Sequence, residues 1–277
     1  MQKKYSWMIL AALLFVLAAC LPYHQAEAAA RARQDYAPVL MYHDIKVTPL
    51  NGFDVTREDF GKQLDWLQAH HYTTLSMDEY LAILESGKPF PEKSILLTFD
   101  DGYEGVYTQA VPELIKHNMK ATFFVFKNGI DTKLVGYPYL TTAELKEMAA
   151  NPLFSIESHT ISHPDLTTLT AEQVQQELAD SRAYLEKITG RPCLALAYPY
   201  GRSNPKVLEA VEAAGYKAAF SIADSDGAGF DTRYTIPRVY MGMELAKNHN
   251  ALFKKYVEKY ASMPSDAFAE RFGELAK

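Results

Sequence analysis

Residues 95–103 read Ile-Leu-Leu-Thr-Phe-Asp-Asp-Gly-Tyr, a short apolar run that ends in two adjacent carboxylates. A run of this kind is typical of a strand buried on both faces, as in a parallel sheet. Burial of one ionised carboxylate is costly and a second one beside it repels the first, so Asp100 and Asp101 need a cation or another partner. The alternative is a plain turn at Asp101-Gly102, with Asp100 capping the helix that follows.

Seven further runs of the same kind precede and follow this one, with helix-like segments between them. They are residues 39–42, 72–75, 121–126, 154–157, 194–198, 217–222 and 236–240. A hydroxyl residue with Asp, Glu or Gln three positions later marks the helix starts, which are Thr56, Ser76, Thr141 and Thr170. Eight strand–helix units in about 210 residues predict an α/β fold, a (β/α) barrel of about seven to eight strands.

The composition is that of one globular domain, and the charge argues against nucleic acid as a partner. Of the 277 residues, 48% are hydrophobic, so a full core can form. With 28 Lys and Arg against 34 Asp and Glu the formal net charge is -6, and no basic block occurs. The chain therefore lacks the electrostatic footprint of a nucleic-acid-binding protein. No apolar run after residue 20 is long enough to cross a bilayer.

The first residues of the chain read as a targeting segment. Two lysines precede an apolar run over 7–19, which is typical of a secretory signal peptide. Its exit, residues 17–20, reads Leu-Ala-Ala-Cys and resembles a bacterial lipobox, in which Cys20 would be acylated. Residues 26–28, Ala-Glu-Ala, offer an ordinary cleavage site instead. We expect an extracytoplasmic protein, either a lipoprotein anchored to the membrane through Cys20 or a secreted one.

These features divide the chain into four parts. We expect a signal peptide of the lipoprotein type at 1–19, a tether at 20–37, a catalytic domain at 38–245 and a C-terminal helical extension at 246–277.

Polar side chains follow the predicted strands at their carboxyl ends, where the loops of a parallel barrel converge. His43 comes directly after the run 39–42, and His159 directly after the run 154–157 and Ser158. His163 lies four residues further on, a spacing that places both imidazoles on one face of a helical turn.

Two imidazoles and one carboxylate form a ligand set for a divalent metal. His159, His163 and Asp101 would leave one coordination position open for water, as a hydrolytic zinc site requires. Zn²⁺ suits this set, and Co²⁺ or Ni²⁺ suit it as well. Asp100 is then free to act as a general base. The alternative for a pair of loop histidines is a solvated site without a ligand.

Three segments together resemble the NodB-type polysaccharide deacetylases, carbohydrate esterase family 4. They are residues 98–103, 158–163 and 198–201, and they follow the order of the family's motifs across most of residues 90–240. The resemblance implies a NodB-like barrel that hydrolyses N-acetyl groups of glucosamine-type sugars with a divalent metal, commonly zinc. It implies metal binding by Asp101, His159 and His163, and a general base at Asp100. The backbone N–H of Tyr200 would stabilise the oxyanion.

Two departures from the family pattern narrow the resemblance. Ala197 stands where the family has Arg, and the only histidine near the C-terminus, His249, lacks the family's Leu-x-Leu-His context. Both features, with the segment Val-Leu-Met-Tyr-His at 39–43, resemble the biofilm poly-β-1,6-N-acetyl-D-glucosamine N-deacetylases, whose topology is circularly permuted. This resemblance implies that His43 is the general acid. Arg238 would supply the charge that position 197 lacks.

Two alternatives to this substrate and activity stay open. The same chemistry on another polymer would make the protein a deacetylase of peptidoglycan or chitooligosaccharides. Ala197 and the missing C-terminal histidine are also compatible with a lipid-anchored glycan-binding protein that has a degenerate site.

Overall fold

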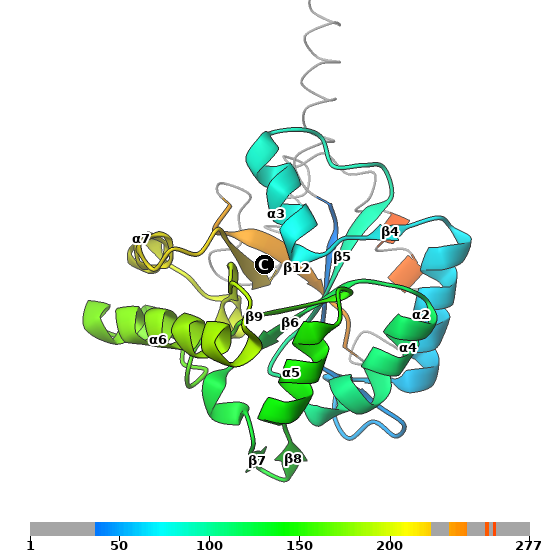
Figure 1. Cartoon of the computed structure of the whole chain (residues 1–277), viewed down its shortest axis with the longest axis horizontal. Helices are drawn as coiled ribbons and strands as arrows, with labels where there is room; N and C mark the ends of the chain where they lie inside the picture. Colours follow the sequence, from blue (N-terminus) through cyan, green and yellow to red (C-terminus); the bar gives the residue numbers. More distant parts are fainter. Residues whose placement is uncertain (1–36, 223–232, 243–252, 255–256, 259–277) are drawn as a thin grey trace, which may run out of the picture.

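The computed structural model describes residues 37–222, 233–242, 253–254 and 257–258. Within these residues seven parallel strands close into a barrel, with neighbours in the order β1-β12-β11-β10-β9-β6-β5 and β5 pairing back to β1. The strands are β1 (Val39–Tyr42), β5 (Ser94–Phe99), β6 (Ala121–Val125), β9 (Phe154–Ser158), β10 (Ala195–Ala197), β11 (Ala218–Ile222) and β12 (Ile236–Tyr240). The predicted (β/α) barrel is confirmed (Figure 1).

The eighth predicted strand lies outside the barrel wall. β4 (Thr73–Thr74) pairs with Ser94 and Ile95 at the start of β5. Further along, β5 pairs with β1 from Leu96 to Phe99 and with β6 at Thr98 and Phe99. The ring therefore closes with seven strands, and β4 only extends one edge of β5.

Helices follow the strands around the outside of the barrel (Figure 1). They are α2 (Arg57–Ala69), α3 (Met77–Ser86), α4 (Val111–Lys116), α5 (Thr142–Ala150), α6 (Ala171–Thr189) and α7 (Pro205–Ala213). Each of the four predicted start residues accepts the backbone N–H three positions later and so caps α2, α3, α5 or α6. No start residue was predicted for α7, or for α4 and the π-helical turn η1 (Val106–Ala110) that leads into it.

The alternation of side chains along the strands divides the core into two parts. In β5, Leu97 and Phe99 belong to the apolar layer beneath the helices, whereas Leu96 belongs to a second cluster with Phe124 and Phe220. Helix α3 adds Tyr80 to this second cluster, with its ring 5.9 Å from that of Phe220. One end of the barrel interior is thus filled with apolar side chains.

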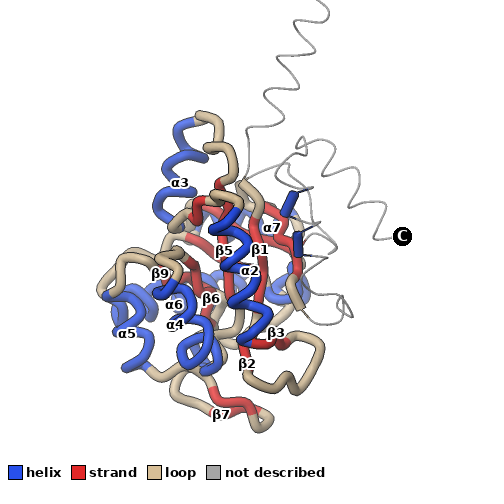
Figure 2. Tube along the Cα trace, turned by 90° about the vertical axis from the view of Figure 1, so that its right-hand side faces the viewer, coloured by secondary structure: helices blue, strands red, loops and turns tan. Residues whose placement is uncertain are grey.

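The loops at the carboxyl ends of the strands carry small additional strands. These are β2 (Asp44–Lys46), β3 (Asp54–Thr56), β7 (Lys133–Leu134) and β8 (Tyr137–Pro138). In Figure 2, β2, β3 and β7 lie at one end of the barrel and α3 at the other. The loop-rich end is therefore the one where the polar strand-end residues emerge.

The segments at the two ends of the chain are only partly described. The predicted signal peptide, Cys20, nearly all of the tether and His249 lie outside the described residues. From the C-terminal extension, Phe253 and Val257 are buried, and the ring of Phe253 lies 5.7 Å from that of Trp66 on α2. No helix in the described ranges combines the length and the hydropathy needed to cross a membrane.

Gly105 fills a position where the structure has no room for a side chain. Its φ of -59° and ψ of -25° suit any residue, so the requirement is for space. A Cβ there would collide with Asp44 Oδ1 and lie 2.5 Å from the carbonyl oxygen of Ile45. We expect Gly105→Ala to lower the free energy of unfolding by about 1–3 kcal/mol, measured by urea denaturation.

Gly61, inside α2, supplies the matched control. A Cβ at Gly61 would meet only Glu113 Oε2, at an ordinary 3.7 Å. Gly61→Ala should therefore raise the stability by about 0.5–1 kcal/mol, because alanine restricts the unfolded chain and favours the helix. Equal effects of the two substitutions would contradict the steric argument.

Candidate metal centre and active site

Asp101 lies on a tight turn immediately after β5. It has a φ of +70° and Gly102 has a φ of +78°, and the Gly102 N–H donates to the carbonyl oxygen of Asp100 at 2.9 Å. Because of this turn the two neighbouring carboxylates have different partners: Asp100 contacts Arg238, and Asp101 faces His159 and His163. Burial raises the pKa of Asp101 to about 6, while a charge on His43 would lower it.

His159 and His163 lie close together, but the expected helical turn between them is wrong. Residues 159–163, here called the histidine loop, are not helical. Thr160 and His163 have φ values of +73° and +59°, which reverse the chain so that the two rings lie 4.8 Å apart. The two rings are therefore close together as predicted, but the backbone between them is a loop with two left-handed residues.

The three predicted ligands converge. Asp101 Oδ1 lies 3.5 Å from His159 Nε2 and 3.3 Å from His163 Nε2. Among the described residues, this is the one group of three or more His, Cys, Asp or Glu side chains close enough to share an ion.

The hydrogen bonds of His159 show that this group fits a cation. Its Nδ1 lies 2.7 Å from the carbonyl oxygen of Ala197, which can only accept, so Nδ1 carries the proton and Nε2 presents a lone pair. Burial lowers the pKa of His159 to about 3, so the ring is neutral. The bare Nε2 then faces Asp101 Oδ1, which is buried without a hydrogen-bond donor. A cation between these two acceptors would satisfy both of them.

Asp100 points into the barrel and binds Arg238 of β12. The guanidinium donates to both carboxylate oxygens at 2.6 Å, and the Arg238 side chain is fully buried. Burial alone would raise the pKa of Asp100, but the charge and hydrogen bonds of Arg238, together with smaller contributions of His159 and His43, hold the pKa below the usual range. Arg238 also donates to Thr98 Oγ1 at 3.2 Å and to the carbonyl oxygen of Ser221 at 3.2 Å. The carboxylate is thereby kept ionised and fixed in orientation.

His43 and Tyr200 flank this centre. His43, directly after β1, is half-buried between the rings of Phe53 and Tyr240, at 5.3 and 5.7 Å. Its Nδ1 is buried without a hydrogen-bond partner. Tyr200, in the short turn η4 (Pro199–Gly201), has a φ of +59°, and its exposed ring lies 4.9 Å from that of His163.

The structure also shows contributions that the sequence did not indicate. One is the carbonyl group of Ala197, which orients His159 although its side chain gives no sign of a role. Another is Glu177 on α6, which accepts two backbone N–H groups of the histidine loop. Beside Asp101, Tyr103 stacks on Tyr139 at 4.8 Å, in agreement with the position of both tyrosines near strand ends.

Comparison with known proteins agrees with this geometry. Residues 87–219 match the family model described as polysaccharide deacetylase. The Bacillus subtilis protein named "Putative polysaccharide deacetylase YxkH" is 35% identical over 221 residues, which are 80% of this chain and 76% of that protein. The poly-beta-1,6-N-acetyl-D-glucosamine N-deacetylase of Staphylococcus epidermidis is 31% identical over 73% of this chain and 78% of that protein.

A solved structure of a deacetylase is also similar to this protein. The Streptococcus pyogenes deacetylase PplD in complex with acetate matches with a TM-score of 0.68 and 29% identity, over 78% of this chain and 96% of that one. The chain therefore belongs to the polysaccharide deacetylase family, and it is a hydrolase that acts on amides.

Proposed function

We propose that this protein is a metal-dependent N-deacetylase of an exported polymer, poly-β-1,6-N-acetyl-D-glucosamine. The observation that carries the proposal is the contact between two acceptors, Asp101 Oδ1 and His159 Nε2, close to the buried pair of Asp100 and Arg238. This arrangement suits a cation, and a donor set of two nitrogens and one oxygen suits Zn²⁺, with Co²⁺ and Ni²⁺ as substitutes.

The residues of the site divide the work of amide hydrolysis. When bound, the dication polarises the N-acetyl carbonyl and acidifies water. Asp100 accepts the proton of the attacking water, because Arg238 keeps its carboxylate ionised. His43 gives a proton to the departing amine as the carbon–nitrogen bond breaks and acetate is released. The backbone N–H of Tyr200 donates to the carbonyl oxygen as negative charge develops on it.

The choice of polymer rests on two observations. The Staphylococcus epidermidis relative is named for this polymer, and the segment 39–43 of the present chain resembles that of such enzymes. Tyr103, Tyr137 and Tyr139 form an aromatic cluster beside Asp101, and the apolar faces of sugar rings pack well on such rings.

We also propose that the protein acts outside the cytoplasm and is held at the membrane by an acyl chain on Cys20. The support is the targeting pattern of residues 1–20. An exported polymer would then meet the enzyme in its own compartment.

Acetate release from defined oligomers tests the activity and the polymer together. We expect release from β-1,6-linked N-acetylglucosamine oligomers at a rate higher than from β-1,4-linked ones. A chelator should abolish the release and added Zn²⁺ or Co²⁺ should restore it, because the ion that Asp101, His159 and His163 would hold is needed for the reaction.

The outcomes separate the competing functions. Faster acetate release from the β-1,4-linked oligomers would show that the substrate is a chitin- or peptidoglycan-type polymer instead. Polymer binding without acetate release, at saturating metal, would favour the glycan-binding alternative. Release that a chelator leaves unchanged would contradict the metal centre.

A further inference from the structure

The histidine loop has a backbone that needs outside support. It contains no glycine, yet Thr160 and His163 lie in the left-handed region of φ. Residues other than glycine occupy this region only where the surrounding structure holds them there. The contacts of the loop therefore decide where His163 lies.

Side-chain oxygens bind the backbone N–H groups of this loop one after another. Ser158 Oγ accepts from Thr160 N at 3.1 Å, and Thr160 Oγ1 accepts from His163 N at 3.1 Å. Between them, Glu177 Oε2 accepts from Ile161 N at 2.8 Å and from Ser162 N at 3.0 Å. Glu177 Oε1 also accepts from the Ser162 hydroxyl at 2.6 Å. One carboxylate thus binds three donors in the middle of the loop.

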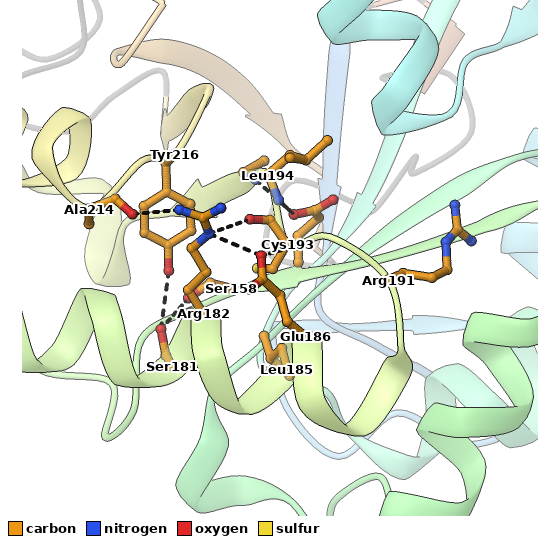
Figure 3. Close-up of polar contacts among 12 residues, drawn as sticks. Ser158, Ser181, Arg182, Leu185, Glu186, Arg191, Cys193, Leu194, Ala214 and Tyr216 are labelled. Carbon is orange, nitrogen blue, oxygen red and sulfur yellow. Dashed lines mark hydrogen bonds and ion pairs between the residues drawn. The ribbon is translucent and has the colours of Figure 1, made fainter.

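Helix α6 holds the start of the loop through a second residue on the same face. Ser181, one turn after Glu177, lies 2.7 Å from Ser158 Oγ and 3.2 Å from the hydroxyl of Tyr216. Figure 3 shows these contacts, with Arg182 beside them donating to the carbonyl oxygens of Cys193 and Ala214. The helix that carries Glu177 is therefore fixed to β9 and to the segments before β10 and β11.

The two histidines differ in what holds their rings. The ring of His159 is fixed by its hydrogen bond to the carbonyl oxygen of Ala197. The ring of His163 lies between those of Phe126 and Tyr200, at 5.7 and 4.9 Å, so its position follows the backbone that carries it. Loss of the loop's support should displace His163 more than His159.

We propose that Glu177 is a positioning residue for the metal centre: by binding the backbone of the histidine loop, it places His163 Nε2 opposite Asp101. This inference rests on the proposed metal-dependent function. It concerns a residue on a helix that is not one of the three ligands and whose hydrogen bonds go to Ile161 and Ser162 between them. Removal of the carboxylate leaves two backbone N–H groups and one hydroxyl without their acceptor, so the loop relaxes and the ligand geometry is lost.

The test is metal binding, measured as the dissociation constant for Co²⁺ in competition with a chelator and as the visible spectrum of the bound Co²⁺. We expect Glu177→Ala to raise the dissociation constant about tenfold or more, in the range found for residues that orient metal ligands. Glu177→Gln retains one acceptor oxygen and should weaken binding less. Asp180→Asn, an exposed carboxylate on the same helix, should bind Co²⁺ like the wild type.

The melting temperature of each metal-free variant separates positioning from folding. A lower melting temperature combined with wild-type Co²⁺ affinity and spectrum in both Glu177 variants would overturn the proposal. If Glu177→Ala does not fold, Glu177→Gln alone decides by the same criterion. A wild-type protein that bound no Co²⁺ would overturn the metal centre itself, whereas equal binding by wild type and variants would overturn only the role of Glu177.

Discussion

Asp100→Asn should lower the rate of acetate release by about 10² to 10⁴-fold while one divalent ion stays bound. Asparagine cannot accept the proton of the attacking water, whereas Asp101, His159 and His163 remain in place to hold the metal. The substitution also leaves the buried Arg238 without its anion, so we expect a loss of about 3 kcal/mol in the free energy of unfolding. Acetate release, metal content and urea denaturation measure the three effects.

His159→Ala is the comparison that distinguishes loss of the general base from loss of a metal ligand. It removes a metal ligand and the hydrogen bond to Ala197, so both the bound metal and the activity should be lost. If acetate release survived Asp100→Asn in a folded, metal-loaded protein, the general base would be another group. If both variants lost the metal alike, the division of roles between Asp100 and Asp101 would be wrong.

The barrel and most of its site were predictable because the signals are local. The strand 95–99 is buried throughout and is followed by two carboxylates. Each capping residue, such as Ser76 with Glu79, forms its bonds within one turn. The position of His159 at a strand end brings it to the same rim as Asp101, whatever lies between them in the sequence.

The geometry inside the site was not predictable to the same degree, because it depends on contacts distant in sequence. Thr160 and His163 adopt positive φ values that no glycine announces, and Glu177 supports them from a helix. Arg238 could be named as a charge to replace the one missing at Ala197, but its bidentate contact with Asp100 joins residues 138 apart in the chain. Only closure of the barrel brings β12 and β5 to the same interior.

Arg238→Met should lower the free energy of unfolding by about 3–5 kcal/mol, because it leaves the Asp100 carboxylate buried without a counter-charge. The double variant Asp100→Asn/Arg238→Met removes both charges, and most of that loss should be recovered. Additive losses in the double variant would show that the side chain of Arg238, stacked 5.3 Å from the Phe124 ring, stabilises the barrel by packing instead.

The same substitution should slow acetate release about 10²-fold, because the base loses its fixed orientation. Its effect on stability should also depend on pH. In the wild type Arg238 lowers the pKa of Asp100, so this pair stabilises the fold above the unfolded-state pKa and the contribution is lost as the pH falls through the folded-state value. In Arg238→Met burial raises that pKa, so protonation of Asp100 relieves the destabilisation on acidification. The difference in unfolding free energy between metal-free wild type and variant should therefore narrow from neutral to acid pH, and a constant difference would mean that the charge of Asp100 is not what Arg238 balances.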